Sequence, residues 1–277
     1  MADALIKAVW PVEPWHLDHH FLGRTLLPAV AMMELLAQTV HEALPACRYT
    51  TIENALFRKF IEIPAGAATI DLQVEIREAA GRIHTRLSSR QTFATLSRLV
   101  CHCQLDFAAD RPDADDQPGP EPIPSGPSVV AIPTQRLYAE LVPFGPSLHS
   151  LQGELLLAGN WAWGKLAAAE SPGAVCGLLG SPFPCDGAMH AACVHGQRLV
   201  DFIPFPVAFS QRRIHRPSRP GGRYTCQAQL SSRTADALVY CLTIWDETGS
   251  KCETITGLEM RDVSGGTIRP PQWLKEC

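Results

Sequence analysis

Two short motifs in different halves of the chain carry residue types that can move protons. The first runs from His19 to Pro28 and reads H-x3-G-x4-P, with Gly23 at its central position. The second reads D-x3-H and holds Asp186 and His190. A histidine and a carboxyl group at one site suit the removal of water, because one takes a proton while the other protonates the departing hydroxyl. Such a site requires the two halves of the chain to pack against each other.

Each motif alone also has an ordinary structural interpretation. His19 precedes a helix-like run, Gly23 lets a ligand approach the backbone closely, and Pro28 is tolerated in a first helical turn. Asp186 falls where an N-cap or first-turn residue of a second helix would accept backbone N–H bonds. His190, four residues later, would share its helix face. Local spacing therefore leaves structure and catalysis both open.

The composition describes a folded protein and limits its partners. The 277 residues are 46% hydrophobic and 19% charged, enough for one large core or two ordinary ones. A net charge of −4 disfavours a nucleic-acid binder. The sequence has no membrane-spanning apolar run, and its first residues lack the features of a signal peptide. Ten cysteines include no C-x2-C pair, so we expect a reduced cytoplasmic protein without a metal site.

A Pro- and Asp-rich segment over 109–127 has the composition of a linker and divides the chain into 1–108 and 128–277. In the first part, Pro28 opens the run AVAMMELLAQTVHEAL, which is apolar around most of a helix and should be buried. Strands are predicted over 70–77, 82–93 and 96–107 from alternating apolar residues. In the last of these, Leu99, Cys101, Cys103, Leu105 and Phe107 would form one apolar face.

The second part repeats this plan. Strand-like stretches over 150–170 precede a helical run over 187–200, and further strands are predicted over 206–216, 223–231, 237–246 and 251–262. Trp161 and Trp163 alternate along one strand and are interpreted as core residues. A buried helix wrapped by a long antiparallel sheet, made twice, is the simplest architecture. We therefore predict an α+β protein.

With these features in place, the chain resembles the dehydratase domains of modular polyketide synthases and related fatty acid synthases, which have a double hot-dog fold. The resemblance covers nearly the whole chain and rests first on the two motifs above. In addition, the segment Val142 to Pro146 is similar to the family's G-Y-x-Y-G-P motif, and Ile203 to Phe205 is similar to its L-P-F motif. It implies two hot-dog units, 1–108 and 128–277, each an antiparallel sheet around a central helix.

The resemblance also implies a reaction. A (3R)-3-hydroxyacyl chain on the phosphopantetheine of an acyl carrier protein would lose water to give the trans-2-enoyl thioester, without a cofactor of the domain's own. His19 would be the base and Asp186 the acid, with His190 orienting Asp186. The remaining family positions would support the site: the Gly23 N–H would polarise the thioester carbonyl, Pro28 would hold the loop, and Phe144, Gly145 and Pro146 would bind substrate. Expected partners are the carrier protein, other synthase domains and a second copy in a homodimer.

Several alternatives stay open at this point. Phe144 stands where the family commonly has tyrosine, so an isomerase or cyclase of the same fold, or a non-catalytic carrier-binding module, is also considered. Cys185 could be a thioesterase nucleophile, and His20 competes with His19 for the role of base. The basic run Gln211 to Arg219 could meet an acidic carrier protein, although a solvated strand end is the simpler interpretation.

Overall fold

A computed structural model describes residues 3–45, 50–93, 96–108, 126, 128–169 and 176–276. Except for Gly126, the predicted linker over 109–127 lies outside the described residues. In the described part of the chain, no helix is both long enough and apolar enough to span a membrane.

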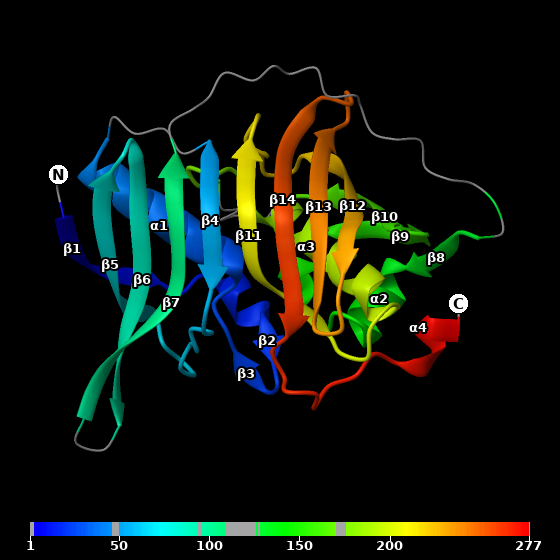
Figure 1. Ribbon diagram of the computed structural model, residues 1–277, viewed down its shortest axis with the longest axis horizontal. Helices are drawn as coiled ribbons and strands as arrows, with labels where there is room; N and C mark the ends of the chain where they lie inside the picture. The colour runs from blue at the N-terminus through cyan, green and yellow to red at the C-terminus, as the bar shows by residue number, and fades with distance from the viewer. Residues whose placement is uncertain are drawn as a thin grey trace.

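Within the described residues, twelve strands form one antiparallel sheet, seen face-on in Figure 1. The first half of the chain supplies β1 (Asp3–Pro11), β4 (Thr51–Phe57), β5 (Thr69–Ala79), β6 (Arg82–Phe93) and β7 (Leu96–Ala108). The second half supplies β8 (Val130–Pro133), β9 (Leu151–Ala158), β10 (Trp161–Ala167), β11 (Pro204–Ile214), β12 (Arg223–Arg233), β13 (Ala237–Asp246) and β14 (Lys251–Asp262). Their order across the sheet is β1-β5-β6-β7-β4-β11-β14-β13-β12-β10-β9-β8.

The two halves join through β4 and β11, which pair in antiparallel register from Leu56 with Ala208 to Thr51 with Arg213. This differs from the expectation of two sheets, one around each helix. Strand patterning shows which face of a strand is buried, but it does not show which strand lies beside it. An unpaired β4 or β11 would leave a row of backbone N–H and C=O groups without partners, and their pairing satisfies both strands.

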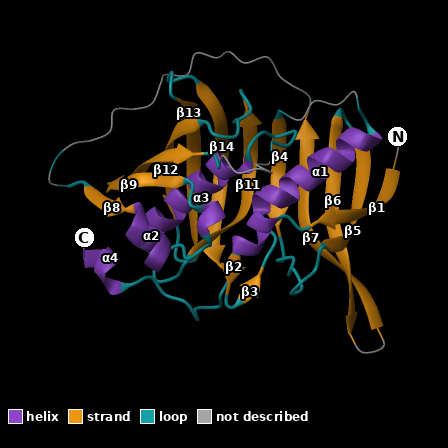
Figure 2. Cartoon of the chain, turned by 180° about the vertical axis from the view of Figure 1, so that it is seen from behind, coloured by secondary structure: helices purple, strands orange, loops and turns teal. Residues whose placement is uncertain are grey.

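Two long helices, α1 (Ala29–Ala43) and α3 (Pro182–Gln197), lie across the same face of this sheet (Figure 2). Helix α1 contacts strands of the first half, α3 contacts strands of the second half, and the two helices contact each other. Pro28 is the N-cap of α1, and its carbonyl accepts hydrogen bonds from Ala31 and Met32. Two apolar helices against two parts of the sheet confirm the predicted α+β architecture.

Helix α3 begins five residues before Gly187, the start that the apolar run indicates. Ser181 is its N-cap, and Pro182 and Pro184 occupy the first turn, where a missing backbone N–H costs little. Asp186 therefore lies inside the helix, and the N-cap or first-turn placement expected for it is wrong. The helix ends at Gln197 rather than at Val200.

The predicted face of the strand over 96–107 is also partly wrong. A β-bulge shifts the register between β6 and β7 from Leu87 opposite Cys103 to Ser88 opposite Cys101. Cys103 and residues after it follow the predicted alternation, but the bulged residue His102 is buried, and before the bulge Val100 is buried while Leu99 is 40% exposed. A bulge adds one residue to a strand and reverses the faces on either side of it.

The remaining elements are short. The short helices are η1 (Pro14–Asp18), α2 (Thr134–Glu140), η2 (Pro146–Leu148) and α4 (Gln272–Glu276), and a two-stranded hairpin is made by β2 (His20–Phe21) and β3 (Arg24–Thr25). Helices η1 and η2 contact each other. This contact brings the segment before His19 next to the segment after Phe144, although they are far apart in sequence.

Candidate active site

A cavity of about 680 Å³ lies where the two halves meet and is lined by residues of both. His19, Leu27 and Met32 come from the first half, and Phe144 and Asp186 come from the second. The volume falls within the range of small-molecule binding sites. The structure thus brings both sequence motifs to one cavity, as their chemistry requires.

His19 follows η1 and is tied to Leu26 at two points. The Leu26 N–H donates to the His19 carbonyl at 2.9 Å, and the His19 Nδ1–H donates to the Leu26 carbonyl at 3.0 Å. Because a carbonyl only accepts hydrogen bonds, Nδ1 carries the proton of the neutral ring and Nε2 keeps its lone pair. Burial lowers the pKa of His19 to about 4, although the nearby Asp186 opposes this shift. Near neutral pH the ring is therefore uncharged and can accept a proton at Nε2.

Gly23 makes the return of the chain from His19 to Leu26 possible. Leu22 and Gly23 form the two-residue turn between β2 and β3, with φ of +51° and +73°. Two positive φ values in a row are typical of a type I′ turn, which favours glycine. Leu22 and Arg24 line the cavity, whereas Gly23 is exposed and is not part of the lining. The turn is thus sufficient to explain a glycine at this position.

Asp186 and His190 lie one helical turn apart on α3, and both are buried. Asp186 Oδ2 lies 3.1 Å from His190 Nε2, but neither atom makes a hydrogen bond to any residue that the structure describes. The orienting hydrogen bond expected between these residues is therefore absent from this conformation, although the two groups are in contact. Catalytic hydrogen bonds are often poorly aligned until substrate is bound.

Phe144 lies between the two motifs. Its ring centroid is 4.4 Å from that of His19 and 5.3 Å from that of His190. Phe144 lines the cavity and has no polar atom in its side chain. The family resemblance leads us to expect a tyrosine hydroxyl at this position, but this chain places an apolar aromatic ring there.

Gly145 and Pro146 do not line the cavity but fix Phe144 to the segment before His19. The Gly145 N–H donates to the Asp18 carbonyl and the Ser147 N–H to the Asp18 carboxylate, both at 2.8 Å. A Cβ at Gly145 would overlap the Asp18 side chain, so only glycine allows this approach. Pro146 begins η2. We call Asp18, Gly145 and Ser147 the interdomain clamp.

Two residues beside the site carry no motif that identifies them. Tyr138 stacks on His149 with ring centroids 4.0 Å apart and contacts the edge of His190 at 6.0 Å. The Tyr138 oxygen accepts from the Leu151 N–H, and His149 Nε2 lies 2.9 Å from the Phe144 carbonyl. Tyr138 therefore packs against His190, and His149 contacts the Phe144 backbone.

Arg212, within the basic run considered for carrier binding, is buried. It makes two hydrogen bonds to Glu253, at 2.8 and 3.1 Å, and both side chains are almost fully enclosed. Cys185, considered as a nucleophile, is also fully buried, and burial raises the pKa of its thiol well above the ordinary value. A thiol with a raised pKa is a poor nucleophile. His20 also lines the cavity, but its side chain is exposed. Within the described residues, its one hydrogen bond joins its Nδ1 to the Thr25 hydroxyl.

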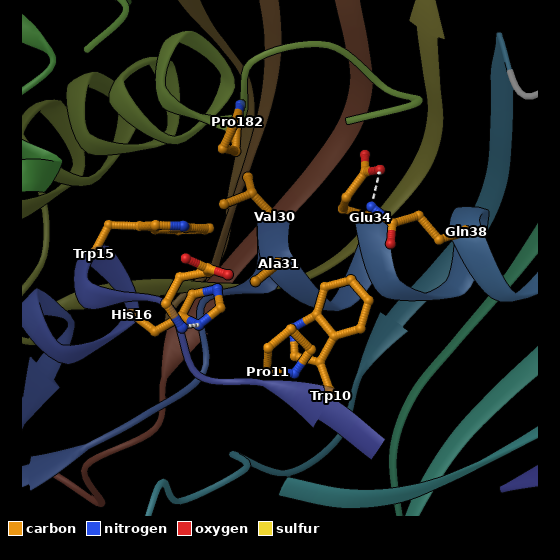
Figure 3. A pocket seen from close by; sticks show the side chains of 10 residues that line it. Trp10, Pro11, Trp15, His16, Val30, Ala31, Glu34, Gln38 and Pro182 are labelled. Atoms are coloured by element: carbon orange, nitrogen blue, oxygen red, sulfur yellow. Dashed lines mark hydrogen bonds between the residues drawn. The ribbon is translucent and has the colours of Figure 1, made fainter. Parts of the chain in front are cut away.

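A second cavity of about 200 Å³ lies beside η1 and α1 (Figure 3). Its polar side chains hold neighbouring backbone in place. His16 Nδ1 accepts from the Glu13 N–H at 2.9 Å, and burial together with the nearby His19 lowers the pKa of His16 to about 4. The Glu34 carboxylate accepts from the N–H groups of Leu178 and Leu179 at 2.7 and 3.0 Å. These contacts indicate that His16 and Glu34, the buried polar side chains of this cavity, stabilise the fold.

Comparison with known proteins identifies the family and the fold of the chain. A family model described as "Polyketide synthase dehydratase domain" matches residues 7–90, and one described as "Polyketide synthase dehydratase N-terminal domain" matches residues 115–268. The chain is 25% identical over 261 residues to the spectinabilin polyketide synthase system protein NorB of Streptomyces orinoci. That match covers 93% of this chain but 12% of NorB.

Solved structures share the fold. The dehydratase domain from the CurF module of curacin polyketide synthase aligns with a TM-score of 0.75 at 16% identity, over 94% of this chain and 93% of that one. The dehydratase domain of RzxB from Pseudomonas fluorescens aligns with a TM-score of 0.71 at 17% identity, over 93% and 94%. One of the two family models covers more than half of the sequence, and the chain belongs to the polyketide synthase dehydratase domain family.

Proposed function

We propose that the chain removes water from a 3-hydroxyacyl thioester, carried on the phosphopantetheine of an acyl carrier protein, to give the trans-2-enoyl thioester. The observation that carries this proposal is the meeting of His19 with Asp186 at one cavity between the halves. A neutral histidine and a carboxyl group are the two proton-transfer groups that an elimination of water needs.

In this reaction, His19 Nε2 accepts the proton from the carbon next to the thioester carbonyl. As the double bond forms, the bond from C3 to the hydroxyl oxygen breaks and the Asp186 carboxyl group donates its proton to that oxygen, which leaves as water. Transfer of a proton from His19 to Asp186 then restores both groups. The hydrogen bond from His19 Nδ1 to the Leu26 carbonyl supports this role because it keeps Nε2 facing away from its own loop.

The test is turnover of 3-hydroxyacyl-pantetheine thioesters, followed by the mass of the acyl group. Loss of the mass of one water by the wild-type protein is expected. His19→Ala and Asp186→Asn should each lower the rate by about 10²–10⁴-fold. His41→Ala and Asp71→Asn are the matched controls, since both residues are exposed and lie outside the cavity lining, and should retain the wild-type rate.

A double-bond isomerase of the same fold is a second candidate, favoured by Phe144. A double-bond shift also needs a base and a proton donor but has no departing hydroxyl, and the Phe144 ring offers that hydroxyl no hydrogen bond. Conversion of a 2-enoyl to a 3-enoyl thioester without change of mass, with no water lost from the 3-hydroxyacyl substrate, would replace dehydration by isomerisation. Binding of a carrier protein without either reaction would indicate a non-catalytic module.

A further inference from the structure

The wall of the main cavity has an uneven distribution of polar side chains. Among the described residues that line it, none is serine, threonine, tyrosine, asparagine or glutamine. The wall consists mainly of aliphatic, aromatic and thioether groups, including Phe21, Leu27, Met32, Met189, Phe205 and Val207. A ligand inside the cavity therefore meets few neutral side chains that can form a hydrogen bond with a hydroxyl group.

The ionisable side chains of the lining fall into two groups. His19, Asp186 and His190 form the candidate active site, where they would act on the reacting carbons. The others are exposed to solvent: His20, Arg24, Arg58, Lys59, Glu140 and Arg269. The first group is committed to the proposed reaction, and the second is charged and exposed to solvent.

Several polar groups behind the wall are already paired, although the buried Gln197 Oε1 has no hydrogen-bond partner among the described residues. The Leu141 carbonyl accepts from Gln197 Nε2 at 3.0 Å, and the Phe144 carbonyl lies 2.9 Å from His149 Nε2. The Tyr138 hydroxyl oxygen accepts from the Leu151 N–H. Cys193 lines the cavity, and its Sγ accepts a hydrogen bond from Gln197 Nε2 at 3.4 Å.

We propose that this cavity selects 3-hydroxyacyl chains that carry no further hydroxyl group along the enclosed part of the chain. This inference rests on the proposed function and names its substrate class. A second hydroxyl would lose its hydrogen bonds to water on entering the cavity and regain few of them. Because burying an unpaired hydroxyl is unfavourable, we expect the protein to use the chain with the second hydroxyl about 5- to 150-fold less efficiently. The reactions that supply this substrate must already have reduced or dehydrated earlier oxygen-bearing carbons.

The experiment compares kcat/KM for 3-hydroxyoctanoyl- and 3,7-dihydroxyoctanoyl-pantetheine thioesters, which differ by one hydroxyl. The wild-type protein should prefer the first by about 5- to 150-fold. Cys193→Ser places a hydroxyl on the wall with little change of size and should narrow this preference. Cys241→Ser makes the same exchange on β13 at a half-buried position outside the lining, and it should leave the preference unchanged.

Binding of non-reacting octanoyl- and 7-hydroxyoctanoyl-pantetheine amides, measured by calorimetry, separates this inference from the proposed function. If the thioesters are not dehydrated but the amides differ in Kd as predicted, the selectivity stands and the reaction is wrong. Equal kcat/KM and equal Kd for both members of each pair would overturn the selectivity. An unchanged preference in Cys193→Ser would show that the wall is not its source.

Discussion

Gly145→Ala should reduce activity by moving Phe144 away from His19. A Cβ at Gly145 would lie 2.6 Å from the Asp18 Cβ and nearer still to the Asp18 carboxyl group, whereas ordinary contact begins at 3.4 Å. The two segments of the interdomain clamp must therefore separate by about 0.8 Å or more. That separation weakens the hydrogen bonds from Gly145 and Ser147 to Asp18.

The effect reaches the site directly, because His19 follows Asp18 and Phe144 precedes Gly145. A misplacement of about 1 Å can lower a catalytic rate by about 10²-fold, so we expect kcat/KM to fall by about that factor. Loss of a hydrogen bond to the Asp18 carboxylate should also lower the free energy of unfolding by about 1.5–3 kcal/mol.

The assay is a double-mutant cycle of Gly145→Ala with Asp18→Gly, read by kcat/KM and by urea unfolding. Asp18→Gly removes both the Cβ and the carboxyl group that the new methyl would meet. In that background, Gly145→Ala should change the free energy of unfolding by less than about 0.5 kcal/mol. Wild-type activity and stability in Gly145→Ala, or an equal loss in both backgrounds, would refute the steric argument.

Three further predictions concern titration and buried charge. Because burial lowers the pKa of His19 to about 4, His19 remains a neutral base down to that pH; the acid limb of kcat/KM should have its midpoint near pH 4, and a midpoint near 6.5 would contradict this. His16 and His19 bind protons near pH 6.5 when unfolded but only near pH 4 when folded, so the free energy of unfolding should fall as pH drops through this window. Urea titrations should show a shallower fall in His16→Asn, and an unchanged slope would exclude His16 as a contributor. Glu253→Leu should cost about 3–5 kcal/mol of unfolding free energy because it leaves Arg212 buried and unpaired, whereas adding Arg212→Met should recover most of it; additive losses would argue against the pairing.

Much of the fold could be predicted because burial patterns are local. The alternation at 70–77 and the apolar run after Pro28 each follow from which side of an element meets the core. The start of α3 could not be predicted in this way, since prolines in a first helical turn resemble the prolines of a loop. The bulge opposite Leu87 could not be predicted either, because it depends on how β7 pairs with β6 and not on the residues of β7 alone.

The site was predictable as a pair of motifs but not as a geometry. Residue types and local spacing leave a structural role open for His19 and for Asp186, and the family resemblance is what identifies them as a pair; the fold brings them to one cavity. The interdomain clamp depends on a contact between residues more than a hundred positions apart, and nothing in the local sequence around Asp18 indicates it. Arg212 shows the same difficulty, since a basic run resembles a solvated surface until its pairing with Glu253 is known. A carbonyl-polarising role for Gly23 stays a prediction.

The pairing of β4 with β11 also affects how the protein is made. During translation, β4 leaves the ribosome long before its partner, since Leu56 pairs with Ala208. At about 5–20 residues per second, the free edge of β4 waits roughly 8–30 s for β11 to be synthesised. An unpaired strand edge is a site where chains associate with one another. The first half is therefore most exposed to aggregation on the ribosome, and a chaperone that covers β4 during this interval should raise the yield of folded protein.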